Sequence, residues 1–328
     1  MKSTSSLQGL PAKLGLLALV GCLSCSEPPV VPFPENEDWL DLARLPEPKA
    51  DFGVASYRGG LYVVGGWTNE YVATRTVFRY DADDDSWERL ANFPFEIADL
   101  ALVVSRDTLF AVGGVRATIG HPIRMLRAYD PATDTWADRP PILDERAGHA
   151  TVELNGTIFL LGGPMNEASS HGPRVPGDSV LEYDVESSTW MYREPMQTPR
   201  YGVVAVRDSE RFHTIGGLLL DTGLPSDEIE TYDPATQGWQ SLTVDPYTTQ
   251  QPANALLNEE IHLIGGSLTS NSTTHRTFSL LDQTWEIRGE MWAPIIAARA
   301  VIHRGELYLL GGRVERTMLN RVLVYRPQ

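Results

Sequence analysis

A pair of adjacent glycines recurs six times along the chain, and each pair closes a short apolar run. The first glycines stand at positions 65, 113, 162, 216, 265 and 311, so the repeat is 46 to 54 residues long. The runs before them, such as Leu61–Val64 and Leu307–Leu310, are continuous enough to be strands buried on both faces. A period near 50 residues with several short strands per unit is typical of a β-propeller.

Each unit continues with an aromatic residue, and in five units a tryptophan follows seven residues later. The aromatic residues are Tyr80, Tyr129, Tyr183, Tyr232, Phe278 and Tyr325, and the tryptophans are Trp87, Trp136, Trp190, Trp239 and Trp285. The segments between them, such as Asp130–Asp134, have the Asp and Pro chemistry of tight turns. Diglycine, Tyr-Asp and Trp in this order resemble the kelch repeat, over residues 38–328. The resemblance implies an all-β, six-bladed kelch-type propeller with four antiparallel strands per blade.

The two ends of the repeat region are complementary. The sixth unit stops at Tyr325–Gln328, before the turn and tryptophan strand that should follow, while Trp39–Pro46 reads like the strand that begins at Trp87. We therefore expect an N-terminal strand to supply the outer strand of the sixth blade. Such a closure leaves no open seam between the first and last blades.

The N-terminal segment differs in kind from the repeats. Lys2 and Lys13 precede the apolar stretch Leu14–Val20, which is typical of an export signal. Leu19-Val20-Gly21-Cys22 resembles the bacterial lipobox, which implies a lipoprotein signal peptide over residues 1–21 and lipidation of Cys22, with Cys25 as the alternative. Residues 22–37, rich in Pro and Glu, then read as a lipid-anchored tether. The expected location is the cell envelope outside the cytoplasm: outer membrane, periplasm or cell surface.

Composition limits the chemistry that the repeats can perform. Both cysteines lie in the N-terminal segment, so the propeller has no thiolate nucleophile and no sulfur ligand for a metal. Some kelch-like propellers are copper radical oxidases with a cysteine–tyrosine crosslink, and this chain lacks the cysteine. We predict no cofactor, no metal site and no catalytic residue. A formal net charge of −16 disfavours nucleic-acid partners.

A position sixteen residues before the first glycine of each pair carries cations in three units: Lys49, Arg146 and Arg200. Kelch substrate receptors often have arginine here, on the face that binds peptides. Because carboxylates pair well with such groups, these residues are candidates for binding an anionic ligand. The alternative is that they bond structurally to loop carbonyls. His171 and Arg174, in the longest loop, are further candidates because recognition concentrates in loops on a rigid scaffold.

The leading hypothesis is an interaction module that binds a protein, peptide or glycan on one rim of the propeller. The rival is a periplasmic sugar isomerase, since exported six-bladed kelch propellers include sialic acid mutarotases. That chemistry needs an acid and a base facing one pocket, for which Asp99, Glu145, Arg146 and Arg200 are available. A carboxylate of perturbed pKa beside an arginine in a central pocket would favour the enzyme. Exposed aromatic residues on a shallow rim would favour binding.

Overall fold

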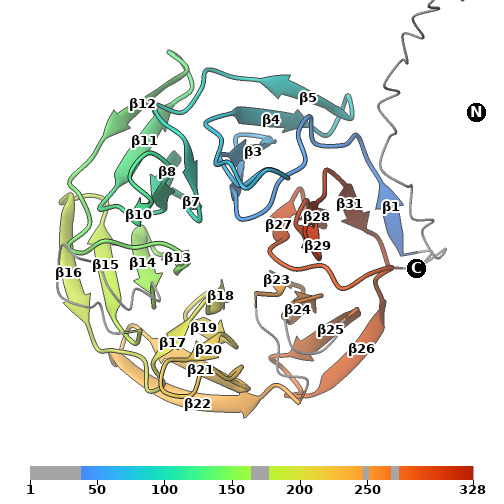
Figure 1. Ribbon diagram of the computed structural model, residues 1–328. Coiled ribbons are helices and arrows are strands. Elements are labelled where there is room, and N and C mark those ends of the chain that lie inside the picture. Colours follow the sequence, from blue (N-terminus) through green and yellow to red (C-terminus); the bar gives the residue numbers. More distant parts are fainter. Residues whose placement is uncertain (1–37, 164–176, 247–250, 267–272, 328) are drawn as a thin grey trace, which may run out of the picture. The chain divides into compact units, whose positions relative to one another are not determined.

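Strands dominate the computed structural model, which describes residues 38–163, 177–246, 251–266 and 273–327. These residues belong to one compact unit, Phe33–Gln328. They form six four-stranded antiparallel sheets set around a central axis (Figure 1). Within these ranges no helix is long and apolar enough to cross a membrane.

Five of the sheets follow the chain from the axis outward. The first blade has β2 (Gly53–Tyr57), β3 (Gly60–Val64), β4 (Val77–Asp81) and β5 (Ser86–Arg89), and the second has β7 (Ala101–Ser105), β8 (Thr108–Val112), β11 (Leu126–Asp130) and β12 (Thr135–Asp138). The third has β13 (Ala150–Leu154), β14 (Thr157–Leu161), β15 (Val180–Asp184) and β16 (Thr189–Arg193), and the fourth has β18 (Val204–Arg207), β19 (Phe212–Ile215), β21 (Glu228–Asp233) and β22 (Gly238–Val244). The fifth has β23 (Ala253–Leu257), β24 (Glu260–Ile264), β25 (Thr274–Ser279) and β26 (Trp285–Glu290).

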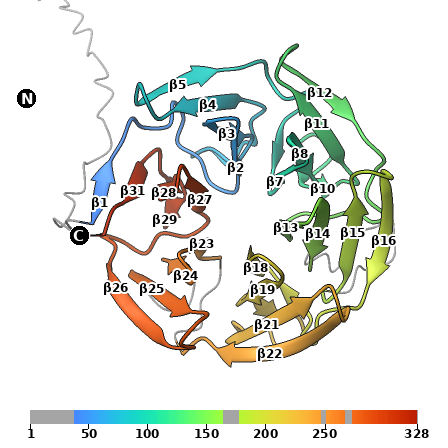
Figure 2. The same cartoon turned by 180° about the vertical axis from the view of Figure 1, so that it is seen from behind.

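The remaining sheet combines both ends of the repeat region. It contains β27 (Arg299–His303), β28 (Glu306–Leu310), β31 (Val322–Tyr325) and, at its outer edge, β1 (Trp39–Asp41). Trp39 pairs with Tyr325 across this edge, as the sequence predicts. Figure 2 shows β1 beside β31 from the opposite side of the ring.

Short strands on one rim form smaller sheets between the blade strands. One is three-stranded, with β6 (Ile97–Ala98), β9 (Val115–Arg116) and β10 (His121–Pro122). Two are pairs, β17 (Arg200–Tyr201) with β20 (Leu218–Leu219) and β29 (Arg313–Val314) with β30 (Thr317–Met318).

The repeated aromatic residues pack as cross-strand pairs. In five blades the tyrosine or phenylalanine contacts the tryptophan opposite it, with ring centroids 4.7–5.1 Å apart. The sixth pair is Trp39 with Tyr325, at 5.0 Å. Several indole N–H groups then donate to a backbone carbonyl of the preceding blade, as from Trp87 to Ala43 at 2.8 Å. In four blades the repeat motif therefore holds its own blade and also bonds it to the preceding one.

Paired glycines close the second strand of each blade because two backbones meet there. Gly65 has a φ of 67°, and a Cβ on it would lie 2.3 Å from the carbonyl oxygen of Ile97 in the next unit. No side chain fits that approach, and the left-handed backbone independently favours glycine. The diglycine therefore fixes the spacing of adjacent blades at this rim.

Candidate functional site

Six equivalent turn residues surround the axis at the rim where the diglycines lie. Each stands fourteen residues before the first glycine of its pair, just ahead of the innermost strand, and each has φ between 51° and 63°. The set is Asp51, Asp99, Gly148, Gly202, Gln251 and Ala297. We call this set the collar. Because β2 begins opposite the end of β3, the collar and the diglycine loops share one rim.

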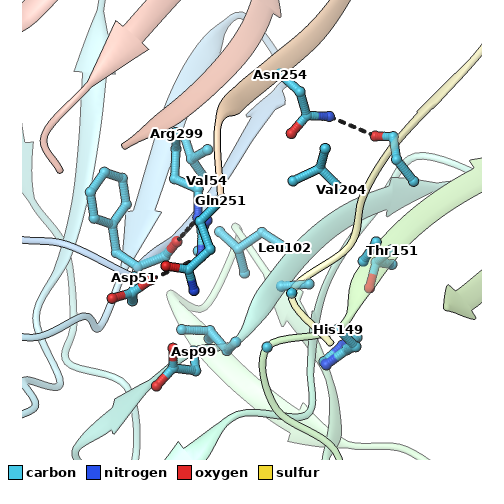
Figure 3. A pocket seen from close by; sticks show the side chains of 18 of the residues that line it. Asp51, Val54, Asp99, Leu102, His149, Thr151, Val204, Gln251, Asn254 and Arg299 are labelled. Carbon is cyan, nitrogen blue, oxygen red and sulfur yellow. Dashed lines mark hydrogen bonds and ion pairs between the residues drawn. The ribbon is translucent and has the colours of Figure 1, made fainter. Parts of the chain in front are cut away.

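A cavity of about 200 Å³ lies at the collar, lined by the starts of the innermost strands. Figure 3 shows Asp51, Asp99 and Arg299 on one side and His149 with Thr151 on another. Val54 and Leu102, also labelled there, line it with apolar surface. A concave site with a few convergent polar groups is the usual form of a ligand pocket.

Of the two collar carboxylates, Asp51 has more positive charge close to it. An Arg299 guanidinium nitrogen lies 3.9 Å from its Oδ1, while Arg299 Nε donates to the carbonyl of Phe52 at 2.9 Å. Burial raises the pKa of Asp51, and the positive charges of Arg299 and Arg313 oppose that rise. Asp51 therefore has cations facing it from the sixth blade and its loop.

Asp99 is held differently. Its backbone N–H donates to the Asp51 carbonyl at 2.8 Å, and its Oδ2 accepts the Trp67 indole N–H at 3.0 Å. Burial and the negative charge of Asp51 raise the pKa of Asp99 to about 7, more strongly than Trp67 and Arg299 lower it. The two carboxylates thus have different surroundings although they occupy equivalent positions.

The opposite wall is polar but uncharged. His149 is 9% exposed, and neither of its ring nitrogens has a hydrogen-bond partner among the described residues. Burial, reinforced by Arg146 and Arg299, lowers the pKa of His149 to about 3, so the imidazole is neutral. Thr151 Oγ1 likewise has no partner within the described ranges. Both residues line the cavity, although these polar atoms are themselves buried.

The three repeat cations do not form a patch on the surface. Lys49, Arg146 and Arg200 are each 0% exposed. Lys49 donates to the carbonyl of Gly65 at 3.0 Å, Arg200 to that of Gly216 at 2.9 Å, and Arg146 to that of Gly162. Each cation thus bonds the first glycine of its own diglycine. This geometry supports the interpretation that the cations bond structurally to loop carbonyls, and not the one in which they bind an anionic ligand.

The other sequence candidates cannot be placed. His171 and Arg174 lie in residues 164–176, and Cys22 lies in residues 1–37, all outside the described residues. Sequence reasoning named Asp99 only as an available group and missed Asp51 and Arg299. A signal was present, because the collar position holds an acid in two consecutive units.

Exposed apolar side chains occur on the loops of the same rim. Tyr71 is 53% exposed and Leu224 is 60% exposed, and Val72, Ile119 and Leu220 are also exposed. All follow a diglycine and precede the third strand of their blade. These rim residues come from three blades. An apolar loop surface beside a polar cavity is a feature of interaction sites.

Comparison with known proteins agrees with this architecture. A kelch-motif family model matches residues 48–94. Alpha-scruin from Limulus polyphemus is 29% identical over 224 residues, which cover 64% of this chain and 24% of alpha-scruin. Kelch-like protein 35 from Mus musculus is 24% identical over 258 residues, covering 78% of this chain and 42% of the mouse protein. The chain thus spans less than half the length of these relatives.

A solved structure with the same fold is that of YjhT. It superposes with a TM-score of 0.75 at 18% identity, covering 88% of this chain and 97% of YjhT. At that identity the likeness concerns the fold. Together with the repeated motifs, these matches support a kelch-repeat β-propeller.

Proposed function

We propose that this chain is a protein-binding module that holds its partner over the collar rim. The observation that carries the proposal is the set of exposed apolar loop residues, Tyr71 and Leu224 foremost, beside a cavity with unpaired polar groups. Aromatic and apolar contacts supply most of the free energy in protein interfaces, and central polar groups fix the register. Kelch-like relatives of this chain support a protein partner.

A display experiment tests this function. A random peptide library is selected on the full-length protein in detergent, and the enriched peptides are titrated against variants. The double variant Tyr71→Ser/Leu224→Ser should bind them at least about tenfold more weakly, a loss of about 1.4 kcal/mol. Leu281→Ser is the matched control, since Leu281 is 76% exposed in the turn after β25, at the opposite rim. Equal losses in both variants, or none in the double variant, would contradict the proposal.

The proposed location is the outer side of a cell membrane, with a lipid on Cys22. The support is the sequence Leu19-Val20-Gly21-Cys22 after an apolar stretch. Labelling with a palmitate analogue should disappear in Cys22→Ser, and the protein should move to the soluble fraction. Cys25→Ser is the control and should keep the label. Labelling that follows Cys25 instead would reassign the anchor.

A second candidate function is acid–base catalysis on a sugar, as in a mutarotase. The observation that favours it is the Asp51–Asp99 pair, in which Asp99 has a pKa near neutrality and Asp51 lies 3.9 Å from a guanidinium nitrogen of Arg299. Anomer exchange of N-acetylneuraminic acid, followed by ¹H NMR, is the test. Acceleration by the wild-type protein that Asp99→Asn removes would support catalysis. Exchange at the uncatalysed rate would rule out this substrate.

A further inference from the structure

Asp99 has less positive charge close to it than Asp51 has. Asp51 faces Arg299 and Arg313, whereas the hydrogen bond to the Asp99 carboxylate comes from the neutral Trp67 indole. That bond occupies Oδ2, and Oδ1 has no donor among the described residues. A half-buried carboxylate next to another carboxylate is stabilised by any cation that reaches it.

The wall beyond the collar limits how far a charged group can enter. The next inward-facing residues of the six innermost strands are mostly apolar or small: Val54, Leu102, Thr151, Ala205, Asn254 and Ala300. Asn254 donates one amide hydrogen to the Ala205 carbonyl at 2.8 Å and carries no charge that could balance a cation. A charge placed there would lose water without gaining a counter-ion. A cationic group therefore stops at the collar, beside Asp99.

We propose that the collar binds the ammonium group of a lysine side chain from the partner protein, at Asp99 Oδ1. The inference rests on the proposed protein-binding function and names the anchor of that interface. The partly buried Trp67 side chain, whose indole bonds Asp99, provides surface for the aliphatic stem of the lysine. The formal charge of −16 draws basic partners toward this protein.

Lysine suits this site better than arginine. A guanidinium binds a carboxylate best through two parallel hydrogen bonds, which need both oxygens. In Asp99 the Trp67 indole already occupies one of them. An ammonium group is a point charge with three donors and needs only one carboxylate oxygen. Its remaining N–H groups can be solvated.

Binding should release protons, because an adjacent cation lowers the pKa of Asp99 from about 7. The groups that face Asp99 are Asp51, Trp67, Tyr201 and Arg299. Burial raises the pKa of Tyr201 to about 12, and His149 has a pKa of about 3, so neither titrates near neutrality. Asp51, the remaining carboxylate, faces cations of its own. Proton release near pH 7 therefore reports on the two coupled carboxylates.

Isothermal titration of the full-length protein with Nα-acetyl-lysine methylamide tests the anchor directly. Titrations at pH 7 in two buffers of different ionisation enthalpy give the number of protons released on binding. A group that is half ionised at pH 7 should release about half a proton per ligand. Affinity should increase from pH 6 to pH 8. The norleucine analogue, which lacks the ammonium group, should not bind, and the arginine analogue should bind more weakly.

Variants separate this inference from the proposed function. Asp99→Asn should weaken lysine binding at least tenfold, while Asp138→Asn, the same charge change on the exposed outer strand β12, should leave it unchanged. Binding without proton release, or no effect of Asp99→Asn, overturns the lysine anchor. Peptides that depend on Tyr71 and Leu224 but not on Asp99 would leave the protein-binding function intact and refute the anchor alone.

Discussion

Replacing Arg146 by alanine should destabilise the ring severely and leave ligand binding by the folded fraction intact. The Arg146 guanidinium is fully buried and donates to the carbonyl oxygens of Gly162 and Ser179, to Ser179 Oγ at 2.7 Å, and to Asp144. Alanine removes the donor to the Gly162 carbonyl and leaves Asp144 without its cation, whereas the Ser179 carbonyl keeps the backbone N–H of Gly162 at 3.1 Å. Breaking such a buried pair costs about 3–5 kcal/mol.

A loss of that size lowers the melting temperature by roughly 10 °C in a chain of this length, at about 2–4 °C per kcal/mol. Circular dichroism melts provide the measurement. The repeat supplies a matched control, because Lys49 occupies the equivalent position and still reaches its glycine carbonyl at 3.0 Å. Arg146→Lys should therefore recover part of the loss, whereas Arg139→Ala at an exposed site should cost almost nothing. If Arg146→Ala melts like the wild type, the structural interpretation of these cations fails.

Three further predictions concern stability. Burial lowers the pKa of His262 to about 4 and of His275 to about 3, so their contribution to folding stability is complete above pH 6.5 and is lost as the pH falls toward 4. The loss is up to about 1.4 kcal/mol per pH unit for each histidine. Melting temperatures between pH 7 and pH 4.5 should show this decline, and a flat profile would contradict it. The effect of pH on stability has the opposite sign for Asp99, because its raised pKa means that the folded state disfavours the ionised form. Asp99→Asn should therefore raise the melting temperature more at pH 8 than at pH 5. An equal change at both pH values would argue against a buried carboxylate. Removal of residues 1–46 should abolish cooperative melting, whereas removal of residues 1–37, which leaves β1 in place, should preserve it; equal melting of the two truncations would show that β1 contributes little.

The sequence predicts the blades well because their determinants are local and repeated. Each Tyr–Trp pair is separated by one short turn, and each diglycine closes the strand beside it. Even the pairing of Trp39 with Tyr325, far apart in sequence, follows from a motif absent at one end and present at the other. Repetition turns a long-range contact into a pattern that can be recognised by comparison of units.

The candidate site was harder to foresee because its residues break the repeat. The collar position accepts any residue that tolerates a positive φ, so Asp, Gly, Gln and Ala all occur there and no motif marks it. Conversely, Arg146 and Arg200 stand out in the sequence because they bond the scaffold, each donating to the first diglycine carbonyl of its own unit. Residues that recur at equivalent positions in this fold therefore indicate a structural role, while functional residues are better sought where equivalent turns differ, as at Asp51 and Asp99.

Exchange of Asp99 with the glycine of the next unit, as Asp99→Gly/Gly148→Asp, would test this view. A Cβ at Gly148 lies 3.0 Å from the Tyr201 ring, so an acid there displaces Tyr201, and binding of the lysine probe should not be restored although the collar keeps its charge.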